Sequence, residues 1–155
     1  MALLLSESEQ VAVLFEVMSM RADWAFAHIA FQHYLTKEND FATWVEGFVD
    51  VYQEDLARLA DEMKVFVEAR EPTSEFVFEP VAEPSFELRF RRSPRPEPGA
   101  VLASVAVDIK RVIDLTIPAA YRDNRISLQL RTNGQRLARF AEQFSLEASR
   151  VLPSG

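Results

Sequence analysis

Apolar and polar residues alternate along three stretches near the start of the chain, at residues 11–20, 24–35 and 41–52. This two-residue period is typical of half-buried β-strands. Alanine is frequent between residues 24 and 35, so a helix is an alternative there, but the aromatic density and the polar residues 36–40 favour a strand. Short polar connections between the three stretches predict an antiparallel meander. One side of the second stretch carries Trp24, Phe26, His28, Ala30, Gln32 and Tyr34, and one side of the third carries Ala42, Trp44, Glu46, Phe48, Asp50 and Tyr52.

The period changes after Gln53. Apolar residues then recur at the i, i+3, i+4, i+7 spacing of one helical face, which predicts an amphipathic helix over residues 54–70. Glu54 and Asp55 in the first turn and Arg70 in the last suit the helix dipole, and Pro72 ends the helix. The apolar face consists of Leu56, Leu59, Ala60, Met63, Phe66 and Val67.

The second half of the chain repeats this order of strands followed by a helix. Short strands are expected at residues 75–79, 85–92, 101–111 and 125–132, and a second helical stripe at residues 134–152. Residues 112–124 are ambiguous, because Pro118 blocks a regular ladder partner. The sequence therefore predicts a single α+β domain over residues 1–155. Its antiparallel sheet has six to eight strands, with the helices of about 54–70 and 134–152 on one face.

The composition and motifs of the chain exclude several classes of functional site. The chain has 155 residues and no cysteine, which excludes disulfides, thiolate zinc sites and cysteine nucleophiles. It has no phosphate-binding loop, no HExxH and no GxSxG motif, so we expect neither an enzyme nor a bound cofactor. His28 and His33 are five residues apart and would point to opposite faces of a strand, so no metal site is predicted. No apolar run is long enough to cross a bilayer and no secretory signal is present, so we expect a cytoplasmic protein without a membrane partner.

The net charge of −7 is unevenly distributed. Residues 1–88 contain 18 acidic and five basic side chains, a charge of −13, whereas residues 89–155 contain six acidic and 12 basic ones, a charge of +6. An acidic chain is repelled by phosphates, so nucleic acid is not expected as a partner. Either the asymmetry disappears when the two halves interleave in the fold, or one acidic face is suited to a basic protein.

Two charged clusters stand out in the region around residue 85. Glu79-Pro80 and Glu83-Pro84 lie between two predicted strands, where proline stiffens the chain and removes a ladder donor. We interpret them as a rigid connection rather than a catalytic pair of carboxylates. The arginines of residues 89–95 are interpreted as a solvated or salt-bridged outer sheet face, with binding of an anion or an acidic peptide as the alternative.

The order of these features resembles the WapI-type immunity proteins of bacterial polymorphic-toxin systems. The resemblance lies in the helix DLARLADEMKVF at residues 55–66 and in the FxFEPxxEPxFELxF pattern at residues 76–90, and it extends over residues 40–152. The family has no invariant catalytic signature. The resemblance implies a non-enzymatic bacterial protein that binds and neutralises a cognate toxin domain.

A protein-binding role places the contact surface among the acidic residues of the first half. The candidate partner-binding residues, chosen for acidic density and expected exposure, are Asp50, Glu54, Asp55, Asp61 and Glu62. They would face a basic toxin domain. One alternative is a small-ligand or enzymatic pocket between sheet and helices, around His28, Trp44 and Tyr121. Another is a structural module that oligomerises through a sheet edge, and the chain would be a monomer or a homodimer.

Overall fold

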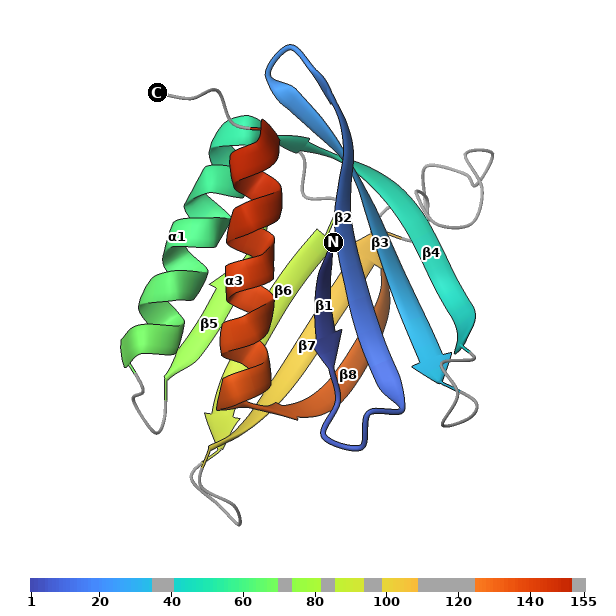
Figure 1. Ribbon diagram of the computed structural model, residues 1–155, viewed down its shortest axis with the longest axis vertical. Coiled ribbons are helices and arrows are strands. Elements are labelled where there is room, and N and C mark those ends of the chain that lie inside the picture. Colours follow the sequence, from blue (N-terminus) through green and yellow to red (C-terminus); the bar gives the residue numbers. More distant parts are fainter. Residues whose placement is uncertain (35–40, 70–73, 82–85, 94–98, 109–124, 152–155) are drawn as a thin grey trace.

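A computed structural model describes residues 1–34, 41–69, 74–81, 86–93, 99–108 and 125–151, which form two four-stranded antiparallel sheets and two α-helices (Figure 1). Sheet A has the order β1-β2-β3-β4 and sheet B the order β5-β6-β7-β8. Helix α1 follows sheet A and helix α3 follows sheet B. The elements are β1 (Ala2–Leu5), β2 (Val11–Arg21), β3 (Trp24–Tyr34), β4 (Phe41–Tyr52), α1 (Gln53–Ala69), β5 (Glu75–Phe78), β6 (Phe86–Ser93), β7 (Ala100–Asp108), β8 (Arg125–Asn133) and α3 (Gly134–Val151).

The predicted α+β class, the antiparallel strands and both helices are confirmed. The expected single sheet is wrong in detail, because the eight strands divide into two sheets of four. Strand β4 ends sheet A, and the chain enters α1 before β5 opens a new sheet. Strand β1 was not predicted: its leucine run pairs with β2 from Ala2 opposite Phe15 to Leu5 opposite Ala12. Residues 112–124, which were ambiguous in the sequence, lie outside the described residues.

Both sheets and both helices contribute to a single hydrophobic core. Phe15 of β2 shows this most directly, since its ring centre lies 6.2 Å from that of Phe86 in β6 and 4.8 Å from that of Phe144 in α3. The two helices lie side by side (Figure 1) and contact each other. Helix α3 also packs on β1, β2 and β8, whereas α1 packs on β4 and β5. The inner face of each sheet is therefore buried in this core.

Arg92 of β6 stabilises the C-terminal end of α1. Its Nη2 donates to the carbonyl oxygens of Phe66 and Val67 at 2.6 and 3.3 Å, and its guanidinium lies 4.7 Å from the centre of the Phe66 ring. A cation at the carboxyl end of a helix is favourable, because the last carbonyl groups of a helix generally lack an N–H partner within it. Arg70, which the sequence analysis placed in the last turn, lies outside the described residues.

The N-terminus of α1 is tied to the turn between β2 and β3. The backbone N–H of Gln53 donates to Asp23 O at 2.9 Å, and its side-chain amide donates to Ala22 O at 2.6 Å. Ala22 adopts a φ of 50°, a left-handed conformation that lets the two-residue turn close. These bonds fix where α1 leaves sheet A.

Candidate functional site

The outer face of sheet A carries a group of aromatic side chains. The strand register places Trp24 opposite Tyr52 and His28 opposite Phe48 on β3 and β4. The Trp24 and Tyr52 rings meet edge to face with their centres 4.4 Å apart. The Phe48 ring stacks on Phe26 at 5.2 Å and on His28 at 4.9 Å. We call Trp24, Phe26, His28, Phe48 and Tyr52 the aromatic face.

Part of this aromatic face is open to solvent. Phe26 is 38% exposed and Phe48 is 43% exposed. A bulge in β2 between Val17 and Ser19 leaves Met18 at 53% exposure. Exposed apolar groups that lie together commonly mark an interaction surface, whereas isolated ones need no explanation. The aromatic face of sheet A is therefore a candidate binding surface.

A hollow of about 650 Å³ adjoins the aromatic face. Its described lining residues are Ser19, Arg21, Trp24, Phe26 and Asp50. The hollow combines two aromatic rings with a carboxylate, a hydroxyl and a guanidinium. Such a combination can accept a large side chain of a partner and orient it through polar contacts. Asp50, a predicted partner-binding residue, lies opposite Phe26 in the β3–β4 register and is thus part of this surface.

The remaining predicted residues lie on α1. Glu54 and Asp61 are exposed, and Glu62 is partly buried beside Arg58, with 3.4 Å between Arg58 Nη1 and Glu62 Oε1. Asp61 and Glu62 line a second hollow, of about 480 Å³, between α1 and β5. The predicted acids therefore do not form one cluster. The structure divides them between the aromatic face, the start of α1 and the α1–β5 hollow.

The predicted exposure of Asp55 is wrong. Asp55 is 6% exposed, and its carboxylate accepts hydrogen bonds from Arg58 Nη2 at 2.9 Å and from the Val81 backbone N–H at 3.1 Å. Arg58 also donates to the Glu79 carbonyl oxygen at 3.1 Å and lies 4.3 Å from the centre of the Phe78 ring. Asp55 and Arg58 together hold the segment that follows β5, which is a structural role.

This contact also bears on the paired Glu-Pro segments. The Glu79 carbonyl and the Val81 amide are held by α1, and Pro80 is buried. The geometry agrees with a rigid connection at Glu79-Pro80. Glu83 and Pro84 lie outside the described residues.

His28 does not face the space between sheet and helices in which the alternative pocket was expected. His28 lies on the outer face of sheet A, because its neighbours Ala27 and Ile29 point into the core. The side chain of Trp44 and all of Tyr121 lie outside what the structure describes. His28 and His33 alternate to opposite faces of β3, as predicted. Among the described residues, no group of three or more histidine, aspartate or glutamate residues could hold a metal ion.

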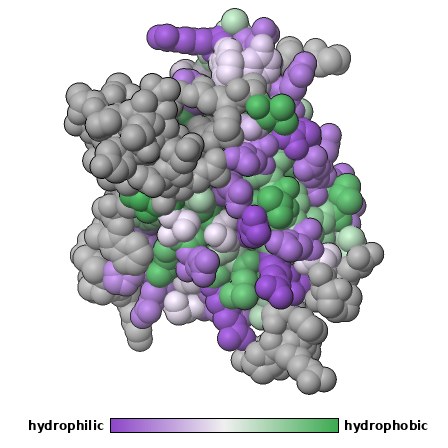
Figure 2. Space-filling model, turned by 180° about the vertical axis from the view of Figure 1, so that it is seen from behind, coloured by the Kyte–Doolittle hydropathy of each residue, from purple (hydrophilic) through white to green (hydrophobic). Residues whose placement is uncertain are grey.

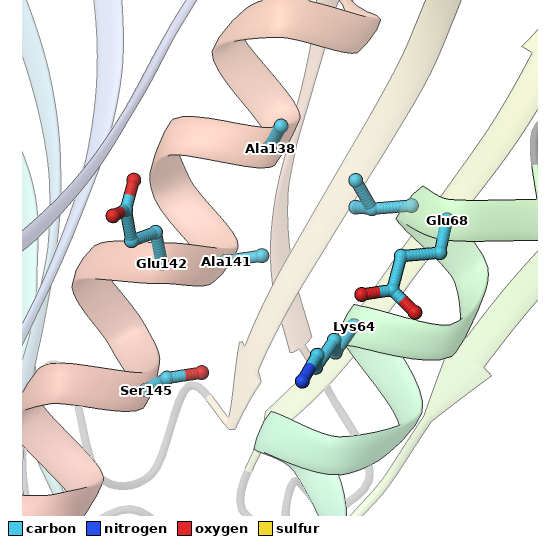
Figure 3. A pocket seen from close by; sticks show the side chains of 7 residues that line it. Lys64, Glu68, Ala138, Ala141, Glu142 and Ser145 are labelled. Atoms are coloured by element: carbon cyan, nitrogen blue, oxygen red, sulfur yellow. The ribbon is translucent and has the colours of Figure 1, made fainter.

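A third hollow, of about 330 Å³, lies between the two helices and is lined by residues of both (Figure 3). Lys64 and Glu68 of α1 face Ala138, Ala141 and Ser145 of α3 across it. The small α3 side chains leave the space, and the charged α1 side chains place its mouth in solvent. In the described ranges, neither helix is long and apolar enough to cross a membrane.

The acidic and basic halves of the sequence meet in sheet B, and ion pairs such as Arg131–Glu7 and Arg136–Glu9 join them. The strands of sheet A all come from the acidic half, residues 1–88, whereas sheet B combines β5 and the start of β6 from that half with the rest of β6, β7 and β8 from the basic half. The outer face of sheet B carries Arg89, Arg91 and Arg131, with Glu75 and Glu87 each within 3.4 Å of Arg89. Seen from behind the helices (Figure 2), hydrophilic residues surround separate apolar ones. The ion pairs of Arg89 agree with the salt-bridged sheet face that we inferred for these arginines.

The aromatic face was not singled out from the sequence, although its signal was present. Trp24, Phe26, Phe48 and Tyr52 fall on the side of each alternating stretch that also carries polar residues. In a half-buried strand that side faces solvent, so large rings there are unexpected. Aromatic residues on the polar side of two paired strands were the available indication of a binding surface.

No family model matches the chain, and no curated protein matches it. A solved structure, that of WHY3 from Arabidopsis thaliana, is similar over 93% of this chain and 84% of that chain, with 9% sequence identity and a TM-score of 0.43. The prediction that nucleic acid is not a partner is corrected on the distribution of charge in the fold. The exclusion rested on net charge, which does not determine the charge of one face, as the arginines of sheet B show. At this TM-score the likeness assigns no function to the chain.

Proposed function

We propose that this chain is a non-catalytic binding protein, an immunity-type inhibitor that neutralises a cognate toxin by binding it directly. The observation that carries the proposal is the exposed aromatic face of sheet A, in which Phe26 and Phe48 stack in the open beside Asp50. Large aromatic side chains supply much of the binding energy at protein interfaces when a partner covers them.

Rigidity supports this use of the aromatic face. The rings stand on β3 and β4, which pair along their length and are backed by the core residues Ala27, Ile29 and Val49. Rings held in this way lose little conformational freedom when a partner binds, so more of their contact energy appears as affinity.

The charge around the aromatic face favours a basic partner. Glu16 lies opposite His28 on β2, Asp50 lies opposite Phe26, and Glu54 lies in the first turn of α1, two residues after Tyr52. Carboxylates at the rim of an aromatic surface steer a basic protein and suit arginine or lysine side chains against the rings. A basic toxin domain and a cytoplasmic site of action are parts of the same proposal.

The test uses the coding region next to this one. Expressed alone, its product should arrest growth, and co-expression of this chain should restore growth and allow the two proteins to be purified together. The variant Phe26→Ala/Phe48→Ala should lose protection and bind the partner about 100-fold more weakly. Both rings are more than a third exposed, so we expect its melting temperature to stay close to that of the wild type.

Leu102→Ala is the matched control, because Leu102 is 51% exposed and lies on the outer face of sheet B. It should protect as the wild type does. The proposal fails if no partner is recovered and no growth arrest is relieved. If Phe26→Ala/Phe48→Ala still protects fully, the toxin is not bound through the aromatic face.

A second candidate function rests on the hollow beside Trp24. Its volume of about 650 Å³ lies within the range of small-molecule sites, which is about 300–1,000 Å³. Quenching of tryptophan fluorescence by a metabolite, abolished in Asp50→Asn, would support this candidate. Co-purification with a protein that occupies the same face would exclude it.

A further inference from the structure

The hollow between α1 and β5 has an apolar floor and an acidic rim. Phe66 and Phe76, 7% and 6% exposed, form the floor with their ring centres 5.7 Å apart. Asp61, Glu62 and Glu75 form the rim. The hollow also exposes two valines, Val65 at 66% and Val77 at 48%.

The wall on the β5 side is a free sheet edge. The Arg92 N–H donates to the Ser74 carbonyl at 3.3 Å, which places the main-chain groups of Ser74 on the side of β6. In an antiparallel pair these groups alternate in direction, so those of Glu75 and Val77 point away from β6. Strand β5 ends the order of sheet B, and in the described part of the chain no other strand pairs with this edge.

We propose that this hollow binds an extended, basic segment of a partner protein, which adds to β5 as a fifth strand of sheet B. The N–H and C=O groups of Glu75 and Val77 would pair with the added strand. Alternate side chains of that strand would then lie against Val65 and Phe66, a form of recognition in which main-chain bonds give affinity and side-chain positions give selectivity. The inference goes beyond the proposed function, because it concerns a different surface and does not depend on a toxin partner.

The negative charge of the rim determines which kind of strand the hollow can bind. Three carboxylates around one hollow favour lysine or arginine and disfavour acidic strands. They also disfavour a second copy of β5, which would bring its own Glu75 to the rim. Edge strands use charge in this way to avoid pairing with themselves.

The arginines near the rim do not cancel this preference. Arg58 approaches Glu62, and Arg89 approaches Glu75, each at 3.4 Å with both side chains between 37% and 48% exposed. Exposed ion pairs of this kind are weak and exchange readily with other cations. Arg58 also bonds Asp55, and Arg89 also bonds Glu87, so both arginines keep a partner when the rim carboxylates turn to an incoming strand.

The test is fluorescence anisotropy with a labelled peptide of alternating lysine and valine, added to the full chain at low ionic strength. We expect saturable binding that weakens as salt is added. Asp61→Lys/Glu62→Lys should weaken it about tenfold or more. Glu142→Lys is the matched control, since Glu142 is exposed on α3 and should leave the affinity unchanged.

A second comparison tests strand addition itself. The same peptide carrying an N-methyl group on every residue keeps its charge but has no N–H group to donate to a sheet edge from either side, and it should bind at least tenfold more weakly. On the protein, Val77→Pro removes one outward N–H, whereas Val77→Thr keeps it. We expect only the proline variant to lose affinity.

The inference is overturned if the alternating peptide does not bind, or if the N-methylated peptide binds equally well. The inference is also overturned if Asp61→Lys/Glu62→Lys binds the peptide as tightly as the wild type does. The comparison of the two peptides uses the wild-type protein, so it stands even if Val77→Pro does not fold. Because the aromatic face is intact in all these variants, loss of peptide binding with retained toxin protection separates this inference from the proposed function.

Discussion

At the scale of single residues, burial separates structural acids from those available to a partner. Asp55 and Glu54 are neighbours in the first turn of α1, and the sequence gives them the same expected role. The structure buries Asp55 between Arg58 and the Val81 amide and leaves Glu54 in solvent. Helical spacing could have indicated the difference, because Asp55 lies four residues before the buried Leu59 and therefore on the same face of the helix.

Asp55→Ala should destabilise the fold by about 1–3 kcal/mol, because it leaves the Val81 N–H and the Arg58 guanidinium without their carboxylate. Glu54→Ala is the control and should change the free energy of unfolding by no more than about 0.5 kcal/mol. Urea denaturation followed by circular dichroism measures both. Equal effects of the two substitutions would contradict the structural role of Asp55.

Glu147 of α3 makes stability depend on pH. It is 4% exposed, and its carboxylate accepts hydrogen bonds from the Met1 ammonium group and from the Val17 N–H and pairs with Arg150. Burial acts to raise the pKa of Glu147, but these bonds and positive charges outweigh it, so the pKa lies below its ordinary value of 4.5.

Because the pKa of Glu147 is lower in the folded than in the unfolded chain, its ionised form stabilises the fold above the unfolded pKa. That contribution is lost as the pH falls through the folded pKa. Glu147→Gln should therefore be less stable than the wild type at neutral pH by about 1–3 kcal/mol, and the difference should shrink in acid. Urea denaturation at a series of pH values measures it, with Glu142→Gln as an exposed control on the same helix. A difference that does not change with pH would contradict the assignment.

At the scale of elements, the sequence predicted most strands and both helices because their periods are local. It did not predict that the strands form two sheets, because alternation records which side of a strand is buried and not which strand lies beside it. Strand β1 was missed since Ala2–Leu5 is a continuous apolar run without alternation. The contact of Arg92 with the end of α1 was not predicted either, because Arg92 reaches it from β6 through tertiary packing.

Arg92→Ala should therefore destabilise α1 and its contact with sheet B. It removes two hydrogen bonds to helix carbonyls and the stacking on Phe66, a loss of about 2 kcal/mol. Arg91→Ala, next in sequence but exposed on the outer face of sheet B, should have little effect. Thermal unfolding of the two variants compares them directly, and an equal loss in both would show that the capping contact is unimportant.

At the scale of the whole molecule, the fold places two kinds of surface around one core. Sheet A presents the aromatic face, while sheet B presents arginines and, at its β5 edge, an acidic hollow beside α1. The candidate site could be foreseen only in part. Asp50 was chosen for its charge and lies beside the aromatic face, but the rings that define this face were read as strand formers. Their exposure follows from which sheet face the helices leave uncovered, and no local pattern contains that information.

The shared core also predicts how the molecule unfolds. Phe15 joins sheet A to sheet B through Phe86 and to α3 through Phe144, so both halves should unfold in one transition. Phe15→Ala leaves a cavity at this junction and should cost about 3–5 kcal/mol. Both tryptophans belong to strands of sheet A, so their fluorescence reports on that sheet, while circular dichroism at helical wavelengths reports on α1 and α3. We expect the two midpoints to coincide in the wild type and to shift together in the variant. Separate midpoints, or a shift in fluorescence alone, would show that the two sheets are independent units joined only by the chain.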